Sequence, residues 1–497
     1  MYRRTEKQRE FVEFHLPFGG KLLSSNRWVK MSQLIPWHQF EDEYCSKLSK
    51  SGQGPPAFSV RMALAALIIK ERLGLSDEEC VEQIHENPYL QYFCGLKEFT
   101  TETPFHPTMY VHFRKRFPSD VINRINEIIV QKAVRATRES NDKNSGKGSG
   151  KSGPKDAEPQ KENQGKLLMD ATCVPADITF PTDLKLLNAA REKTEGIIDV
   201  LHKGRGKGYK KPRTYRKKAR KAFLAIAKSK KIQRAKLRKA IRSQLGFIRR
   251  NLKSIEKLAE IVPLTVLSKR QYRDLLVISE LYRQQQWMHD HRSKRIDDRI
   301  VSLSQPHVRP IKRGKAGSDT EFGPKISVSL VGGYGFVDRT SWDNFNESGD
   351  LKDQVEAYKR RFGFYPKSVH ADKLYRTREN LRYCKARKIR LSGPRLGRPP
   401  TVTIENIDRL KAEAKRARQD EIDRIPIEGK FGQGKRKYGI GRLMTKLAET
   451  SETAISLCFL VMNLERWLAA IFLRLFFKEQ NFDFELKTYM FFVPQCS

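Results

Sequence analysis

The chain has 497 residues, more than one ordinary hydrophobic core organises, so two or three structural units are expected. Its 97 Lys and Arg against 57 Asp and Glu give a formal net charge of +40, which indicates a polyanionic partner, nucleic acid first and an anionic membrane surface second. The seven cysteines are scattered without a Cys-x-x-Cys pair, which argues against a disulfide framework or a zinc cluster and fits a reducing compartment.

Residues 1–136 are predicted to form an N-terminal helical DNA-binding domain. The first residues are basic with no apolar stretch behind them, so we do not expect a secretory signal. Val60, Leu64 and Ile68 recur at helical spacing, and Ser76 with Glu79 matches a capping box. Short helices with basic outer faces would suit a DNA-reading module, and a helical packing domain with a solvated charged face fits the pattern as well.

Residues 137–165 are rich in Gly, Ser and Lys and almost free of apolar side chains. Such a segment cannot bury enough surface to become ordered. The sequence therefore predicts a disordered linker and the main domain boundary here.

Residues 166–200 are expected to begin a catalytic core. An apolar run leads directly into Asp170, the pattern of a core strand that delivers a carboxylate to a sheet edge. Asp177 and Asp183 are alternatives for the same role, but Asp183 precedes a leucine-rich stretch and is better explained as a helix N-cap.

Residues 201–308 are predicted to form a basic helical insertion. Between Val200 and Ile255 there are 22 Lys and Arg and no Asp or Glu, more than half of the net charge of +40. A solvated helix face usually carries both signs, so this one-sign block indicates a surface for a polyanion. Apolar residues at steps of three or four predict two antiparallel helices, the first with a basic face.

Residues 309–477 should complete the core, followed by a C-terminal tail at 478–497. A hairpin around Gly332-Gly333, a helix at 351–361, a short strand that ends in Asp372, a helix at 377–388 and a strand at 389–392 predict an α/β fold with a mixed sheet flanked by helices. Arg395 and Arg398 lie in a Gly/Pro-rich loop that would suit phosphate contacts or be a rigid turn without a ligand. The apolar run from Ala454 to Phe477 is interrupted by polar and charged residues, so we expect a buried helix and no membrane span.

Glu428 is a single carboxylate within a run of basic residues and glycines, from Arg424 to Tyr438. A surface ion pair is the ordinary explanation of such an acid. The cations outnumber what one acid can pair with, a pattern that suits a metal site beside a phosphate backbone.

Asp170, Asp372 and Glu428 are the candidate catalytic and metal-binding residues. The two aspartates end predicted strands of one sheet, so their carboxylates can converge at its edge. Hard oxygen ligands favour Mg²⁺ or Mn²⁺, and the lack of paired Cys or His disfavours zinc. Two such ions could activate a water or sugar hydroxyl and stabilise the leaving oxygen of a phosphodiester.

Three segments resemble the acidic motifs of insertion-sequence DDE transposases, most closely the fourth and fifth insertion-sequence families. They are Asp170-Ala-Thr, His370-Ala-Asp372-Lys-Leu-Tyr375, and Arg424-x-x-x-Glu428 followed by Lys435. The resemblance covers roughly residues 55–135 and 165–470. It implies an RNase H-like catalytic core, a divalent metal held by the three acids, and phosphate contacts from Arg424 and Lys435, to which we add Arg436.

The last motif departs from the family at two points. Glu421 stands where the family has a tyrosine. The family's glutamate lies on a helix, yet Pro426 and nearby glycines disfavour one, so we expect Glu428 near a helix start with Pro426 in the first turn.

The resemblance and the charge together predict a DNA transposase that cleaves mobile-element ends and joins them to target DNA. Its expected partners are double-stranded DNA, both terminal inverted repeats and target, and a second copy of the chain on that DNA, in the bacterial cytoplasm at the nucleoid. A nuclease of the same fold that cuts without joining is an alternative, as is a non-catalytic basic nucleic-acid-binding protein.

Overall fold

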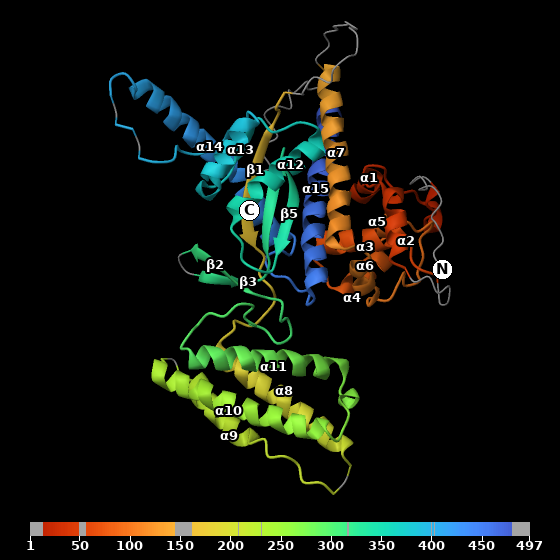
Figure 1. Cartoon of the computed structure of the whole chain (residues 1–497). Coiled ribbons are helices and arrows are strands. Elements are labelled where there is room, and N and C mark those ends of the chain that lie inside the picture. The colour runs from red at the N-terminus through yellow and green to blue at the C-terminus, as the bar shows by residue number, and fades with distance from the viewer. Residues whose placement is uncertain are drawn as a thin grey trace. The chain divides into compact units, whose positions relative to one another are not determined.

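The computed structural model (Figure 1) describes residues 13–48, 56–144, 162–206, 208–229, 231–315, 318–398, 400–401 and 403–479. The chain divides into two compact units. Unit 1 comprises Met1–Val174, Lys325–Ser341 and Phe345–Ser497, and unit 2 comprises Pro175–Pro324 and Trp342–Asn344.

Helices make up the N-terminal part of unit 1. They are α1 (Arg27–Leu34), α2 (Glu41–Ser46), α3 (Val60–Leu73), α4 (Asp77–Glu86), α5 (Pro88–Cys94), α6 (Met109–Arg116) and α7 (Ser119–Asn144), with 3₁₀ turns η2 (Pro17–Gly19) and η3 (Trp37–Phe40). The predicted capping box is confirmed, because the side chains of Ser76 and Glu79 each bond the other's backbone N–H. Gly74 ends α3 at a φ of 68°, where glycine avoids strain.

These N-terminal helices share one hydrophobic core with the sheet. Leu64 of α3, Val328 of the sheet and Phe459 of α15 (Ala448–Glu479) belong to the same buried cluster. The domain predicted for residues 1–136 is thus packed into the same compact unit as the sheet. α7 continues to Asn144, into the predicted linker, and residues 145–161 lie outside the described residues.

The sheet of unit 1 has five strands in the order β5-β4-β1-β6-β7. They are β1 (Lys166–Cys173), β4 (Lys325–Val331), β5 (Tyr334–Ser341), β6 (Ser368–His370) and β7 (Arg390–Leu391). β4 is antiparallel to β1 and β5, whereas β1, β6 and β7 are parallel. The predicted mixed α/β sheet is confirmed. So is the hairpin, whose Gly332 and Gly333 have φ values of 57° and 83°, as a tight two-residue turn requires.

Helices cover both faces of this sheet. On one face, Leu168 packs with Ile427 and Phe431 of α14 (Ile407–Lys437) and with α15. On the other face, Leu167 and Met169 pack with α12 (Leu351–Phe362) and α13 (Arg378–Ala386). Side chains along β1 point alternately to the two faces, so the position of a residue in the strand decides whether it faces α14. The 3₁₀ turns η5 (Glu347–Asp350) and η6 (Lys373–Tyr375) precede α12 and α13.

α15 is, within the described residues, the one helix long and apolar enough to cross a membrane, over Ala448–Phe476. Of its most apolar window, 61% is buried inside the unit, and the helix contacts α7, β5 and α3. α15 is thus a core helix, as the interrupted apolar run predicted.

Unit 2 is built mainly from helices around two small apolar cores. Its elements are α8 (Asp183–Gly204), α9 (Arg216–Ala227), α10 (Arg234–Ala259), η4 (Leu264–Val266), α11 (Lys269–Asp290) and a hairpin of β2 (Pro310–Lys315) and β3 (Ser318–Phe322). The predicted antiparallel pair corresponds to α10 and α11, and α8 and α9 join it. α8 runs across the predicted boundary at residue 200, because Leu187 and Ile198 bury against α10 rather than against the sheet.

Candidate active site

Asp170 lies in the middle of β1, and the prediction that it ends the strand is wrong. β1 continues to Cys173 because it keeps pairing with β4, where Asp170 is opposite Val328. On its other side β1 pairs with β6 only from Lys166 to Leu168. Asp170 therefore lies just past the point where β6 stops.

Asp372 follows β6 at the corresponding position. The last parallel pair is Leu168 with His370, and each aspartate is two residues beyond its strand's member of that pair. The backbone of Asp372 is still extended, and its carboxylate accepts a hydrogen bond from the N–H of Lys373 at 2.6 Å, which caps η6. Because paired residues of parallel strands point to the same face, this register directs both aspartates toward the face that α14 covers.

Glu428 lies well inside α14, and the prediction of a nearby helix start is wrong. The helix begins at Ile407 and passes through Pro426. An internal proline costs about 3 kcal/mol because it lacks an N–H and crowds the preceding turn. Ile427, Phe431 and Gly434 are buried along this stretch. Burying the first two side chains returns about 1.5 to 3 kcal/mol each, enough to outweigh the local propensities.

Electrostatic effects link α14 to Asp170. Arg424 Nη2 donates a hydrogen bond to Glu428 Oε1 at 3.0 Å, one helical turn away. Burial raises the pKa of Asp170 to about 6; the N–H of Ala171 and the guanidinium of Arg424 lower it, and the carboxylates of Glu347 and Glu428 raise it. Carboxylates from β1, η5 and α14 therefore repel one another here, and a bound cation would reduce that repulsion.

Glu347 is an acid of this site that the sequence reasoning missed. It is the first residue of η5, just before α12. An acid in that position ordinarily favours a helix N-terminus through the helix dipole, so nothing local marks it as functional. The sequence signal that could have identified Glu347 is its position between the hairpin and the second acidic motif. There it lies just before the helix that covers one face of the sheet.

Two protein families match parts of the chain. Residues 369–465, which include Asp372 and Glu428, match the family described as "Transposase DDE domain", and residues 18–116 match "Transposase domain (DUF772)". Together the two matches indicate the insertion-sequence DDE transposase family. Asp170 lies outside both matched ranges.

A curated relative of this chain comes from Rhizobium meliloti and is named "Uncharacterized protein ORF8 in nfe locus". The two are 28% identical over 158 residues, which cover 32% of this chain and 66% of the relative. No solved structure matches the chain.

Three of the basic residues predicted to contact DNA lie on the C-terminal half of α14 in the transposase. Arg424 is held by Glu428, Lys435 is half-buried in the last turn, and Arg436 is exposed, with its Nε 3.3 Å from the carbonyl of Gly432. They therefore share one helix with the third acid.

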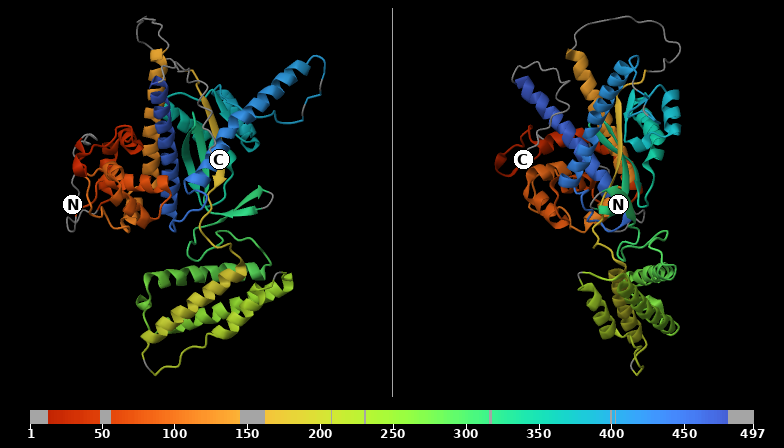
Figure 2. Two further views of the ribbon diagram at one scale, coloured as in Figure 1. Left: turned by 180° about the vertical axis from the view of Figure 1, so that it is seen from behind. Right: turned by 90° about the vertical axis from the view of Figure 1, so that its left-hand side faces the viewer.

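Arg395 and Arg398, by contrast, are not brought to the acids. Both are exposed in the segment before α14, and Arg395 Nη2 donates to Glu413 Oε1 at 2.8 Å. Glu413 is fifteen residues before Glu428 on a continuous helix, about 22 Å at 1.5 Å per residue. This N-terminal half of α14 projects away from the sheet in the left view of Figure 2.

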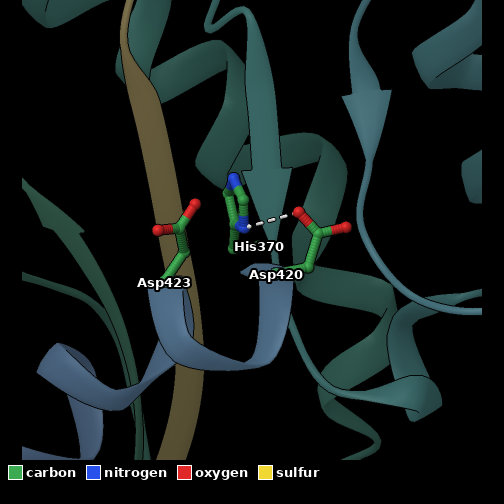
Figure 3. Close-up of side chains that lie close together, drawn as sticks. All are labelled: His370, Asp420 and Asp423. Atoms are coloured by element: carbon green, nitrogen blue, oxygen red, sulfur yellow. Dashed lines mark ion pairs between the residues drawn. The ribbon is translucent and has the colours of Figure 1, made fainter. Parts of the chain in front are cut away.

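A second group of potential metal ligands lies beside the strands of the transposase (Figure 3). His370 at the end of β6 and Asp420 and Asp423 on α14 place ligand atoms within 4.8 Å of one another. Both oxygens of Asp420 accept from Arg390 at 2.7 Å, and Asp423 accepts from Lys166 at 2.6 Å. Burial lowers the pKa of His370, so the ring is neutral near pH 7.

Two acids are therefore matched by two cations in this group, and a divalent ion would add uncompensated charge. The contacts join α14 to the first residue of β1, the last residue of β6 and the first residue of β7. We interpret the group as an anchor that holds α14 on the sheet with Glu428 two turns further along.

Proposed function

We propose that this chain carries out cut-and-paste transposition: metal-dependent cleavage at the ends of a mobile element, then joining of the freed 3′ hydroxyls to target DNA. One observation carries the proposal: Asp170 and Asp372 occupy matching positions on adjacent parallel strands, and α14 supplies Glu428 to the surroundings of Asp170. The strand order β5-β4-β1-β6-β7, with a parallel β1-β6-β7 part, supports an RNase H-like core.

The residues present fit divalent metal ions. Asp170, Asp372 and Glu428 offer the carboxylate oxygens that Mg²⁺ and Mn²⁺ prefer, and the raised pKa of Asp170 reflects burial and neighbouring negative charge that a bound cation would offset. One or two such ions would supply a polarised water or hydroxyl and stabilisation of the leaving oxygen. The chain itself orients the ligands: the N–H groups of Ala171 and Lys373 hold the two aspartates, and Arg424 holds Glu428.

DNA binding is proposed for two basic surfaces, each considered within its own unit. In unit 1, Arg424, Lys435 and Arg436 would contact phosphates beside the acids, and Arg395 and Arg398 would contact them farther along the projecting part of α14. In unit 2, exposed cations in α9 and directly after it border a shallow hollow; they are Lys217, Arg220 and Lys221 in the helix and Lys228 just beyond it. Joining two ends in one reaction would require at least a homodimer on the DNA, at the bacterial nucleoid.

A strand-transfer assay with a labelled duplex that carries the element's end tests the proposal. Each of three variants removes one proposed metal ligand: Asp170→Ala, Asp372→Ala and Glu428→Ala. Each should lower the rates of cleavage and joining at least a hundredfold. Glu421→Ala, an exposed acid two turns earlier on α14, is the matched control and should retain activity.

The outcomes separate the candidate functions. Cleaved ends without joined product in the wild-type chain would indicate a nuclease. Unchanged DNA processing in the three alanine variants would remove the catalytic assignment and leave a nucleic-acid-binding protein.

A further inference from the structure

The turn that carries Glu347 is fixed against the turn that follows Asp372. Nδ2 of Asn380 donates to the carbonyl oxygens of Ser348 in η5 and of Tyr375 in η6, both at 2.8 Å. Asn380 is 4% exposed, so these bonds are shielded from water. η5 and η6 are thereby held side by side, and η6 begins directly after Asp372.

The Glu347 side chain lies against the first residue of β4, beside the end of β1. It is 17% exposed, and its Oε2 lies 3.7 Å from Nζ of Lys325, the first residue of β4. Lys325 is paired with Cys173 at the end of β1, three residues beyond Asp170. The Glu347 charge raises the pKa of Asp170, and its effect ranks ahead of that of Glu428.

A buried hydroxyl lies near enough to the same carboxylates for their charges to affect its pKa. Tyr375 is 0% exposed, and within the described residues its hydroxyl makes no hydrogen bond of good geometry, although Ser327 is near enough to affect its pKa. Burial raises the pKa of Tyr375, and the charges of Glu347, Asp170 and Asp350 raise it further. A buried hydroxyl without a partner among several acids indicates room for a ligand or its water.

Asp350, the other acid of η5, does not face this site in the same way. Its Oδ1 accepts from Nη1 of Arg339 at 2.7 Å, so its charge is compensated by β5. Glu347, whose Oε2 is 3.7 Å from Nζ of Lys325, is the acid of η5 whose charge raises the pKa of Asp170.

We propose that Glu347 is a fourth carboxylate ligand of the divalent metal ions that Asp170, Asp372 and Glu428 bind. The inference rests on the proposed function, since it extends the same site. The four carboxylates carry four negative charges when ionised. Two cationic side chains lie against them, Arg424 beside Glu428 and Lys325 beside Glu347. Mg²⁺ and Mn²⁺ take six oxygen ligands, so three acids leave positions that a fourth can occupy.

Binding of Mn²⁺ to the full chain, measured by electron paramagnetic resonance of the free ion, tests the proposal without requiring activity. Glu347→Gln keeps the shape of the side chain and removes the charge, and it should raise the Kd for Mn²⁺ at least tenfold. Asp353→Asn, at an exposed acid in the first turn of α12, is the matched control and should leave the Kd unchanged.

Thermal unfolding with and without Mn²⁺ separates a ligand from a structural residue. In chelator, Glu347→Gln should melt at or above the wild-type temperature, because it removes a charge from a group of like charges. With Mn²⁺ it should show less of the stabilisation that bound ions confer on the wild type. A metal-free Glu347→Gln chain that melts well below wild type would overturn the proposal, as would an unchanged Kd.

Asp170→Asn distinguishes this inference from the proposed function. Loss of Mn²⁺ binding in Asp170→Asn with normal binding in Glu347→Gln would reject Glu347 alone. Normal binding in both variants would reject the metal site itself.

Discussion

At the scale of single residues, Asp170 is set apart by its surroundings. Burial within the sheet and the carboxylates of Glu347 and Glu428 both favour its neutral form, and Arg424 only partly opposes them. Ionisation of all these acids therefore brings like charges together, and cations bound at the proposed metal site would reduce that repulsion. Protons and metal ions compete for the same oxygens.

The raised pKa of Asp170 predicts a pH dependence of stability in chelator, where no metal is bound. That pKa is about 6 in the folded chain and 3.8 for an ordinary aspartate, so ionisation of Asp170 destabilises the fold above pH 6. Asp170→Asn should raise the free energy of unfolding at pH 8 by at most about 3 kcal/mol, from 1.36 kcal/mol per pKa unit. The gain should shrink as the pH falls through 6 and vanish below 4. Chemical unfolding of both chains between pH 4 and 8 measures it, and a pH-independent difference would contradict the assignment.

At the scale of elements, α14 is a helix although part of its sequence disfavours helix formation. Pro426, Gly429, Gly432 and Gly434 all lower helix propensity, and the buried contacts of Ile427 and Phe431 maintain the helix. Gly434 also has a packing role: a Cβ there would lie 2.6 Å from Cδ1 of the buried Ile440.

Two glycines of α14 provide a matched test. A Cβ at Gly429 meets nothing within 4 Å, so Gly429→Ala should stabilise the chain by about 0.5 to 1 kcal/mol through helix propensity. Gly434→Ala makes the same propensity change but overpacks Ile440, so it should destabilise by about 1 to 3 kcal/mol. Equilibrium unfolding of the two variants decides the point, and equal effects would show that α14 does not pack closely there.

At the scale of the whole molecule, the positive charge is concentrated in unit 2. α9 carries exposed cations along most of its length, whereas Arg216 at its start is paired with Asp199 and Arg283 of α11 is paired with Glu280. Unpaired surface cations bind phosphates by releasing counterions, so their contribution depends steeply on salt.

A triple variant of α9, Lys217→Gln, Arg220→Gln and Lys221→Gln, tests this surface. If all three contact phosphates, the slope of log K against log salt should become less steep by about 2.7, from about 0.9 per contact with duplex DNA. Arg283→Gln, whose charge Glu280 already compensates at 2.6 Å, should leave the slope unchanged. Fluorescence anisotropy of a labelled duplex at several salt concentrations measures both, and equal slopes in wild type and triple variant would exclude α9 as a DNA surface.

Much of the fold could be predicted because it depends on near neighbours. The hairpin at Gly332-Gly333, the capping box at Ser76, and the helix and strand on either side of Asp372 follow from turn chemistry and apolar period, and the structure has all of them. Boundaries were less predictable, since α7 and α8 extend through positions where composition alone indicated a break.

The sequence by itself determined the charge, the family motifs and the local elements, because these depend on residue identity and short spacing. Only the tertiary structure decided that α14 passes through Pro426, that Asp170 and Asp372 align across β1 and β6, and that the charge of Glu347 acts on Asp170. Those outcomes depend on the pairing of strands some two hundred residues apart and on burial by distant side chains, and neither is encoded in any short segment.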